Sequence, residues 1–428
     1  MRLESLLCVS VQFLKFFTPE QNNYVNIISD QSRNFEINMH KLCRQVSIES
    51  PGPIIKDCVF NFIVPVPDTP PKGARIKIVC AGACYRRNRS SSISSISSVS
   101  SELSDYPGPQ TAREQTTATA TTPTTTTSPA HHGIRDGALF PGYEVAGVID
   151  TLGSDLDEEE CGLKVGQRVV VYPFEDVPNG YAELIVVPDL KYVVPIPDEL
   201  PISVAAMLPT GALLAMNAVF SAHNIVTKLL QERDLSDKCK ILIVGTGGLA
   251  LWAVRIAAYH FYNSECRHRV QITVASLRDE GFLLAKEIKN VNVVQWNEDL
   301  YEKQLIERTK DACNGPVDIV IDFGTTSRSL HRSMQCLTKG GVVLVSEEVA
   351  EKLLPKFARL AEERQQKILP VANGTVDQLH ELVKLVADKK IEPPPHSVFP
   401  CEEAPEVIRK LCSSEIPGRA ILRFHDID

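Results

Sequence analysis

The sequence predicts an α/β protein that combines a doubly wound parallel sheet with a smaller antiparallel, barrel-like domain. From about residue 209, apolar β-rich runs alternate with helix-length amphipathic segments, as in parallel strands joined by crossover helices. Before that point, short β-like runs lie close together with Gly, Pro and Asp between them. A long Ser/Thr-rich stretch interrupts this antiparallel part, and we expect it to be a disordered insertion.

Length and composition agree with this fold class. The 428 residues are enough for two or three domains, and the content of 43% hydrophobic and 23% charged residues is ordinary for a globular protein. The net charge of −8 gives no global positive field that could hold nucleic acid or an anionic membrane. We therefore expect a small-molecule substrate, with no nucleic-acid partner and no membrane partner.

The compartment is inferred from the cysteines and the N-terminus. The 12 cysteines are scattered and form no C-x-x-C pair, which favours buried free thiols over a disulfide framework. Glu4 and Lys15 interrupt the apolar N-terminal run, which fits a signal peptide poorly. The most apolar later stretch, residues 241–258, contains three glycines and Arg255 and is no uninterrupted span. We expect a soluble, cytoplasmic protein, with a mitochondrial location as the alternative.

The antiparallel domain is expected over residues 51–208, after an N-terminal extension of residues 1–50. Its strand-like segments are residues 58–62, 74–79, 145–149, 168–172, 182–187 and 192–194. The insertion covers residues 87–133, and residues 90–128 hold 11 Ser and 10 Thr among 39 residues. Such a segment buries too little apolar surface to offset its ordering entropy.

The parallel sheet is expected over residues 209–388, and residues 389–428 are expected to return to the first domain. Six strands are predicted for the sheet, at residues 240–244, 271–275, 291–294, 317–321, 341–345 and 368–371. Six parallel strands suffice for a complete dinucleotide-binding fold. The C-terminal segment has a predicted short helix at residues 403–411 and a strand at residues 419–424.

The strongest local motif follows the first of these six strands. Gly245, Thr246, Gly247, Gly248 and Leu249 lead from a buried strand into a helix, as a pyrophosphate site requires. Gly245 permits the tight turn, Gly247 lets the backbone approach the phosphates, and the small Ala250 lets helix and strand pack closely. Gly324 and Ser346, which follow the fourth and fifth strands, complete the predicted cofactor contacts.

The end of the second strand indicates which cofactor is preferred. NAD(H) sites place an acidic residue there, but this chain has Ser276 followed by Leu277 and Arg278. A hydroxyl and a guanidinium suit a 2′-phosphate, so NADP(H) is the predicted cofactor. Asp279 is adjacent, and a shift in alignment of a few residues would reverse the preference.

An ordered series of segments then gives a resemblance. Its members are Pro141–Ile149, Val165–Val170, Gly180–Glu183, Val194–Asp198, Ala205–Pro209, the glycine loop, Val317–Asp322 and Leu337–Gly341. In this order they resemble the medium-chain dehydrogenase/reductase superfamily, the group of zinc alcohol dehydrogenases and quinone oxidoreductases, over about residues 55–424. The resemblance implies a GroES-like catalytic barrel, a Rossmann cofactor domain and hydride transfer in the cleft between them. It also makes a homodimer an expectation.

The departures from the family pattern concern zinc. The resemblance places the three ligands of a catalytic zinc at Cys84, Tyr143 and Thr210, and only Cys84 is a good ligand type. The hydroxyl residue of the proton relay corresponds to Arg86, which cannot shuttle a proton near neutral pH. The four-cysteine structural lobe is also missing between Gly142 and Gly180. No zinc is expected at either site.

Three residues remain as catalytic candidates. Tyr143 is a candidate proton donor or carbonyl partner, Thr210 is a candidate for lining the nicotinamide site, and Cys84 is a candidate for a similar chemical role. The alternative for Tyr143 and Cys84 is ordinary packing. The insertion enters directly after Cys84, and Arg86–Ser91 resembles a target for a basic-directed kinase, with a solvated flexible loop as the alternative.

Two functions are compatible with these features. The first is a zinc-independent, NADP(H)-preferring oxidoreductase that transfers hydride to or from a small carbonyl, enone or quinone-like substrate. The second is a catalytically inactive pseudo-oxidoreductase that keeps the scaffold for binding or regulation, because a fold alone does not guarantee its chemistry. The intact glycine loop favours the first, whereas Glu347 after the fifth strand would disfavour cofactor if it faced the site.

Overall fold

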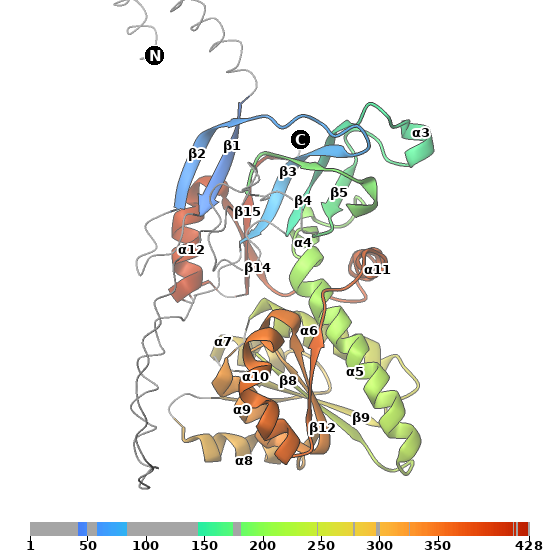
Figure 1. Cartoon of the computed structure of the whole chain (residues 1–428), viewed down its shortest axis with the longest axis vertical. Coiled ribbons are helices and arrows are strands. Elements are labelled where there is room, and N and C mark those ends of the chain that lie inside the picture. Colours follow the sequence, from blue (N-terminus) through green and yellow to red (C-terminus); the bar gives the residue numbers. More distant parts are fainter. Residues whose placement is uncertain are drawn as a thin grey trace, which may run out of the picture.

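The computed structural model describes residues 42–48, 58–83, 144–173, 181–245, 247–276, 279–296, 300–324, 326–413, 415–416 and 418–426. The predicted insertion at residues 87–133 lies outside them. Figure 1 shows two bodies stacked along the long axis of the molecule, one built mainly of antiparallel strands and the other a helix-covered parallel sheet. The predicted fold class is confirmed.

The larger body is a six-stranded parallel sheet with the order β10-β9-β8-β11-β12-β13. All six predicted strands are present, each within a few residues of its expected bounds: β8 (Cys239–Val244), β9 (Val270–Ser276), β10 (Val291–Gln295), β11 (Val317–Asp322), β12 (Leu337–Ser346) and β13 (Lys367–Val371). Each strand pair is in parallel register, for example Ile319 opposite Ile241.

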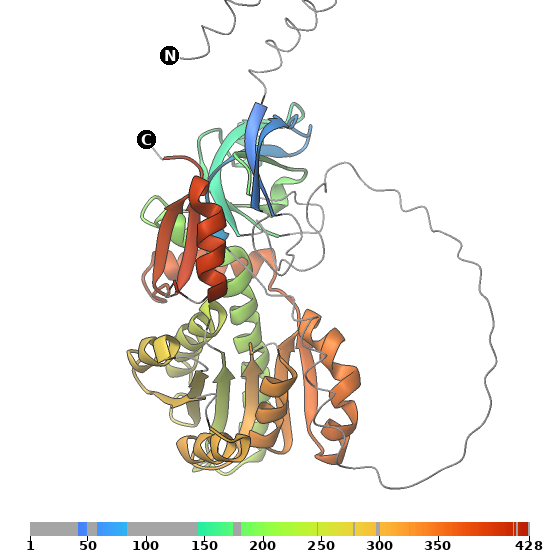
Figure 2. The same cartoon turned by 90° about the vertical axis from the view of Figure 1, so that its left-hand side faces the viewer.

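Helices cover both faces of this sheet, as Figure 2 shows. They are α5 (Leu213–Glu232), α6 (Gly248–Tyr262), α7 (Asp279–Lys286), α8 (Glu302–Ala312), α9 (Ser327–Cys336), α10 (Glu347–Glu363) and α11 (Val376–Ala387). Successive residues of β8 enter different cores: Ile241 and Ile243 pack with α5 and α6, whereas Leu242 and Val244 pack with α8, α9 and α10. This double burial explains why the strand is an unbroken apolar run.

The smaller body is a seven-stranded sheet with the order β14-β15-β3-β4-β5-β7, with β6 paired to β3. Its strands are β3 (Ala74–Ala83), β4 (Val145–Leu152), β5 (Arg168–Val171), β6 (Leu184–Val187), β7 (Val193–Pro195), β14 (His396–Pro400) and β15 (Arg419–Arg423). Short helical elements accompany it, namely α3 (Glu158–Cys161), η4 (Leu190–Tyr192), α4 (Ile202–Ala205), η6 (Cys401–Glu403) and α12 (Ala404–Ser413). Because β15 pairs with β3, the last strand of the described chain lies in the sheet of the smaller body.

Two features differ from what the sequence suggests. A separate hairpin forms from β1 (Leu42–Ile48) and β2 (Cys58–Pro65), so part of the expected N-terminal extension is a strand. β14 also lies outside the predicted strands, and it pairs in parallel with β15. β1 has 7 residues and β14 has 5, and each is stabilised by pairing with another segment of the chain. Such pairing gives little sign in the strand's own sequence.

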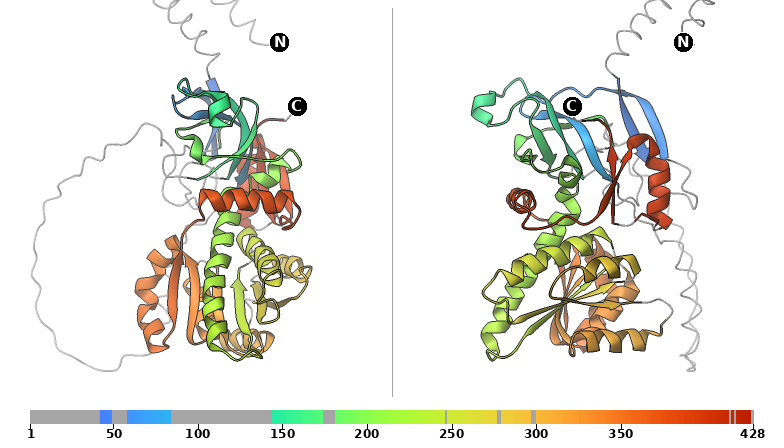
Figure 3. Two further views of the ribbon diagram at one scale, coloured as in Figure 1. Left: turned by 90° about the vertical axis from the view of Figure 1, so that its right-hand side faces the viewer. Right: turned by 180° about the vertical axis from the view of Figure 1, so that it is seen from behind.

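A π-helical segment, η5 (Leu208–Ala212), leads directly into α5 and connects the two bodies. Figure 3 shows α5 running along the parallel-sheet body and α11 crossing near the junction. The combined stretch Leu208–Glu232 is long and apolar enough to span a membrane by composition alone. Nine side chains of α5 are buried against α6 and the sheet, so we interpret it as a core helix.

Seven of the cysteines have side chains that the structure describes; all seven are free, and five of them are buried. Burial raises the pKa of the Cys80, Cys239 and Cys336 thiols to about 12 in each case. These three groups therefore stay protonated at neutral pH and act as small apolar side chains.

Candidate functional site

The glycine loop lies where the strand order of the parallel sheet reverses. β8 and β11 are neighbours, yet the chain leaves β8 for α6 on one face and β11 for α9 on the other. In open α/β sheets, ligands bind in the crevice outside the carboxyl ends of the strands at such a point. The loops after β8 and β11 are therefore the candidate site.

Each glycine of the loop has a separate structural reason. Gly245 has a φ of +147°, and a Cβ there would lie 3.0 Å from Ala250 Cβ and 3.3 Å from Phe323 Cβ. Gly247 is the N-cap of α6, and a Cβ built on it meets no described atom within 4 Å. The open space at Gly247 is where the backbone N–H groups that start α6 can be approached by an anion.

Gly248 is required for a different reason, because the side chain of Arg419 passes directly over it. A Cβ at Gly248 would collide with Arg419 Cδ. Arg419 begins β15 in the other body and is buried, with 9% of its surface exposed. The positively charged guanidinium of Arg419 is thereby brought to the N-terminus of α6, which is the positive end of the helix dipole.

Glu144 holds Arg419 in this position. Its buried carboxylate accepts hydrogen bonds from Arg419 Nη2, from the Thr210 hydroxyl and, at 3.2 Å, from the Gly211 backbone N–H. Gly211 in turn lies against Leu249 of α6, since its Cβ position is 3.7 Å from Leu249 Cγ. The carboxylate thus joins β4, η5 and β15 at the glycine loop. A buried charge with several donors is stable only as such a network.

The loop after β11 is fixed by a second buried carboxylate. Asp322 accepts hydrogen bonds from the Gly324 backbone N–H at 2.7 Å and from the hydroxyls of Ser329 and Ser333, both at 2.8 Å. Complete burial raises the pKa of Asp322, and these three donors oppose the rise. A Cβ at Gly324 would collide with Ser329, so only glycine fits here. The network holds the loop that packs against Gly245, since Phe323 Cβ lies 3.3 Å from the Gly245 Cβ position.

Comparison with known proteins agrees with this geometry. A family model for zinc-binding dehydrogenases matches residues 298–422. A zinc-type alcohol dehydrogenase-like protein of Schizosaccharomyces pombe is 23% identical over 304 residues, which are 67% of this chain and 82% of that protein.

Solved structures match over almost the whole chain. The quinone oxidoreductase of Coxiella burnetii superposes with a TM-score of 0.61 at 17% identity, covering 90% of this chain and 100% of the other. An acetophenone reductase of Geotrichum candidum, solved in complex with NAD, has a TM-score of 0.57 at 16% identity, covering 90% and 98%. The family model, the relative and the solved structures together support a likeness to the medium-chain dehydrogenase/reductase superfamily. They support an oxidoreductase of this type with a nucleotide cofactor, which is taken up below as the proposed function.

The structure also locates some of the remaining residues that were predicted to contact the cofactor. Leu249 is half-buried in the first turn of α6, and Ser346 is the half-buried N-cap of α10. Ser276 ends β9 and is completely buried, with its carbonyl accepting the Trp296 N–H at 2.7 Å. Glu347 is exposed at the start of α10. Thr246 and Arg278 lie outside the described residues.

Of the three catalytic candidates, the structure describes only Thr210. It is 3% exposed, and its hydroxyl donates to Glu144 within the network beside the glycine loop. Cys84 and Tyr143 lie outside the described residues, although the chain leaves β3 at Ala83 and re-enters at Glu144. Both ends of this gap adjoin the network, because a Cβ at Gly82 would collide with Glu144.

Of the three positions at which the resemblance places zinc ligands, the structure describes Thr210 alone. Thr210 occupies one ligand position, and a neutral hydroxyl whose proton is donated to a carboxylate is a poor zinc ligand. Among the described residues there is no group of three His, Cys, Asp or Glu side chains that could hold a metal ion. The match to the zinc-binding family model begins at residue 298 and includes none of the three ligand positions.

Arg419 and Glu144 are functional candidates that sequence reasoning missed. Glu144 follows Tyr143 within a quoted motif, but its role depends on an arginine 275 residues away. Arg419 was expected only as the first residue of a C-terminal strand. The observation that marks Glu144 and Arg419 as candidates is that two opposite charges are buried together, and only the folded structure shows this.

Proposed function

We propose that this protein is a zinc-independent, NADP(H)-preferring reductase of small carbonyl, enone or quinone-like substrates. The observation that carries the proposal is the open space at Gly247, with the Arg419 side chain passing over Gly248. An anion placed there meets the N-terminus of α6 and a guanidinium at once, which is what a pyrophosphate needs. The dinucleotide supplies the hydride when it is bound.

The protein's own groups position the reaction. Arg419 and the backbone N–H groups that begin α6 would hold the pyrophosphate, and Glu144 keeps the arginine side chain from leaving the crevice. Glu144 and Thr210 are positioning residues in this scheme, since they act through Arg419 and η5. The Asp322 network sets the opposite wall.

The preference for NADP(H) rests on residue types. Ser276 stands where a carboxylate would repel a 2′-phosphate, and Arg278 supplies a cation two residues later. Ser276 is completely buried, so it would favour NADP(H) only because it carries no negative charge that could repel the 2′-phosphate. The attractive contact with the 2′-phosphate is assigned to Arg278.

Zinc independence rests on the residue types at positions 143 and 210. Without a Lewis acid, the developing negative charge on a carbonyl oxygen needs a hydrogen-bond donor, and Tyr143 is our candidate for it. The phenol would donate a proton to the oxygen as the hydride reaches the carbonyl carbon, or the β-carbon of an enone.

The test is NADPH oxidation by metal-stripped protein with a panel of enones, quinones and aldehydes. We expect turnover of at least one class that is unchanged by chelator or by added zinc, and a loss of kcat in Tyr143→Phe with little change in KM for NADPH. Activity that appears only with stoichiometric zinc would overturn the proposal. Tight NADPH binding without any turnover would instead support the pseudo-oxidoreductase.

A further inference from the structure

A polar cavity lies at the end of the parallel sheet opposite to the glycine loop. It has a volume of about 470 Å³ and is formed where β8, β9 and β10 begin and where the chain turns toward β11. It is lined by Lys238, Tyr262, Arg267, His268, Val270, Gln271, Asn290, Val291, Asn292 and Asn314. The β8 strand separates it from the crevice by six residues, or about 20 Å.

The charge of the lining is positive, although the whole chain carries −8. Lys238 and Arg267 are exposed, and no carboxylate lines the cavity. Arg267 Nε donates to His268 Nε2 at 2.8 Å. Within the described part of the chain, neither Lys238 nor Arg267 has an ion-pair partner. Two cations therefore face this cavity without a counter-charge.

Four amide side chains, those of Gln271, Asn290, Asn292 and Asn314, also line the cavity. The Asn290 backbone carbonyl accepts a hydrogen bond from the Tyr262 hydroxyl at 2.5 Å, and Asn292 Nδ2 donates to the Ala312 carbonyl at 3.2 Å. Gln271 differs, since its Nε2 is buried and has no hydrogen-bond partner among the described residues. A buried amide donor of this kind is usually satisfied by water or a ligand.

We propose that this cavity binds a small phosphorylated metabolite with a hydroxyl-bearing body, separate from the cofactor crevice. Lys238 and Arg267 would hold the phosphate, because both are cationic donors and Arg can engage two oxygens at once. Gln271 Nε2 donates to an oxygen of the ligand, and the asparagine side chains contact its hydroxyls. The volume exceeds what a lone inorganic ion fills and lies within the range of small-molecule sites.

Ribose 5-phosphate is the probe, titrated by calorimetry into the full-length protein with and without saturating NADPH. We expect binding that persists in the presence of NADPH and is absent for ribose. Lys238→Ala with Arg267→Ala weakens it at least tenfold, since two charge-assisted contacts are lost. Gln271→Glu, which keeps the shape and adds a negative charge, weakens it as well.

The matched control is Lys303→Ala with Arg359→Ala, which removes two cations from exposed positions on α8 and α10. This control leaves the affinity for ribose 5-phosphate unchanged. The proposal is overturned by equal affinity in the two double variants, by displacement of the probe by NADPH, or by no binding at millimolar probe. Circular dichroism of each variant establishes that it is folded.

Discussion

Substitution of Gly247 by valine separates cofactor binding from folding. The residue has φ −90° and ψ −177°, an extended conformation that valine adopts readily, and a Cβ there meets no described atom within 4 Å. Because valine is a poorer N-cap than glycine, the free energy of unfolding should fall, by about 1 kcal/mol at most. The isopropyl group would, however, fill the space through which the pyrophosphate reaches the N-terminus of α6.

The loss of affinity follows from the hydrogen bonds that the displaced phosphate can no longer form. Backbone donors to a charged acceptor contribute about 1.5–3 kcal/mol each, so losing two costs at least about 3 kcal/mol. That corresponds to an NADPH affinity weaker by about 100-fold or more. Calorimetric titration measures the affinity, and thermal unfolding of the same samples measures the stability.

Gly245→Ala is the matched control because it should lower the stability of the fold, which Gly247→Val largely preserves. The backbone at Gly245 has φ +147°, and the added Cβ would lie 3.0 Å from Ala250 Cβ. We expect a loss of stability of about 1–3 kcal/mol. Unchanged NADPH affinity in Gly247→Val, or a loss of its stability beyond about 1 kcal/mol, would refute the placement of the phosphates.

Three further outcomes are expected. Arg278→Ala lowers the affinity for NADPH about tenfold and leaves that for NADH unchanged, as titration of both would measure, because one charge-assisted contact is lost. Burial beside His223 lowers the pKa of His260 to about 4, so the imidazole takes up a proton on unfolding when the pH is between about 4 and 6.5. The free energy of unfolding, measured with denaturant, should therefore fall by about 1–2 kcal/mol as the pH drops from about 6.5 to 4, allowing for partial exposure. His260→Phe should remove that loss. Arg332→Met costs about 2 kcal/mol of unfolding free energy, whereas Arg328→Met costs less than about 1 kcal/mol.

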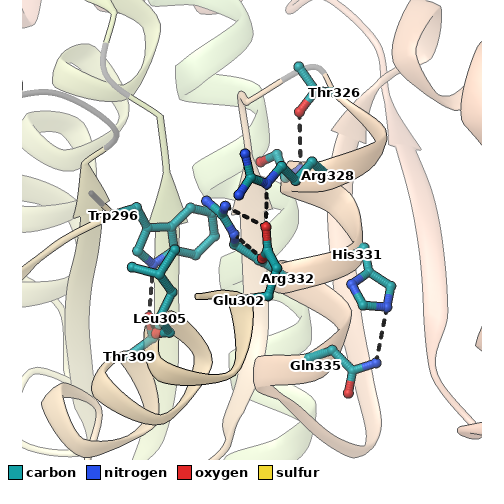
Figure 4. A network of polar contacts seen from close by, with 10 residues as sticks. Trp296, Glu302, Leu305, Thr309, Thr326, Arg328, His331, Arg332 and Gln335 are labelled. Carbon is teal, nitrogen blue, oxygen red and sulfur yellow. Dashed lines mark hydrogen bonds and ion pairs between the residues drawn. The ribbon is translucent and has the colours of Figure 1, made fainter. Parts of the chain in front are cut away.

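The arginine prediction follows from the network in Figure 4. Both arginines bind Glu302, but the side chain of Arg332 is 3% exposed and lies 5.1 Å from the Trp296 ring centroid, whereas that of Arg328 is 54% exposed. Equal costs for the two substitutions would contradict this burial argument. For the acid window, the exposed His380→Phe is the control, and an acid loss that persists in His260→Phe would exclude His260 as its source.

The central strand β8 was predictable because it is an apolar run buried on both faces, whereas the edge strands β10 and β13 are partly exposed. Ile241 to Val244 alternate between two cores, so the sequence shows no polar face and its interpretation is unambiguous. The glycine loop was predictable for a similar reason, since its turn, strand and helix are contiguous. Local chemistry decides both features.

The network that surrounds the loop was not predictable. Glu144 and Arg419 are brought together only because β15 pairs with β3 and β3 pairs with β4. The polar cavity is likewise assembled from the segments that precede four different strands. Contacts of such long sequence separation leave no periodic signal in the chain.

The central claim is that the crevice beside Gly247 and Arg419 binds NADP(H) without zinc. Calorimetric titration of the metal-stripped protein with NADPH and, in parallel, with NADH tests it most directly. The account predicts micromolar binding of NADPH and weaker binding of NADH. Absence of binding by both cofactors, or NADPH binding that requires added zinc, would contradict it.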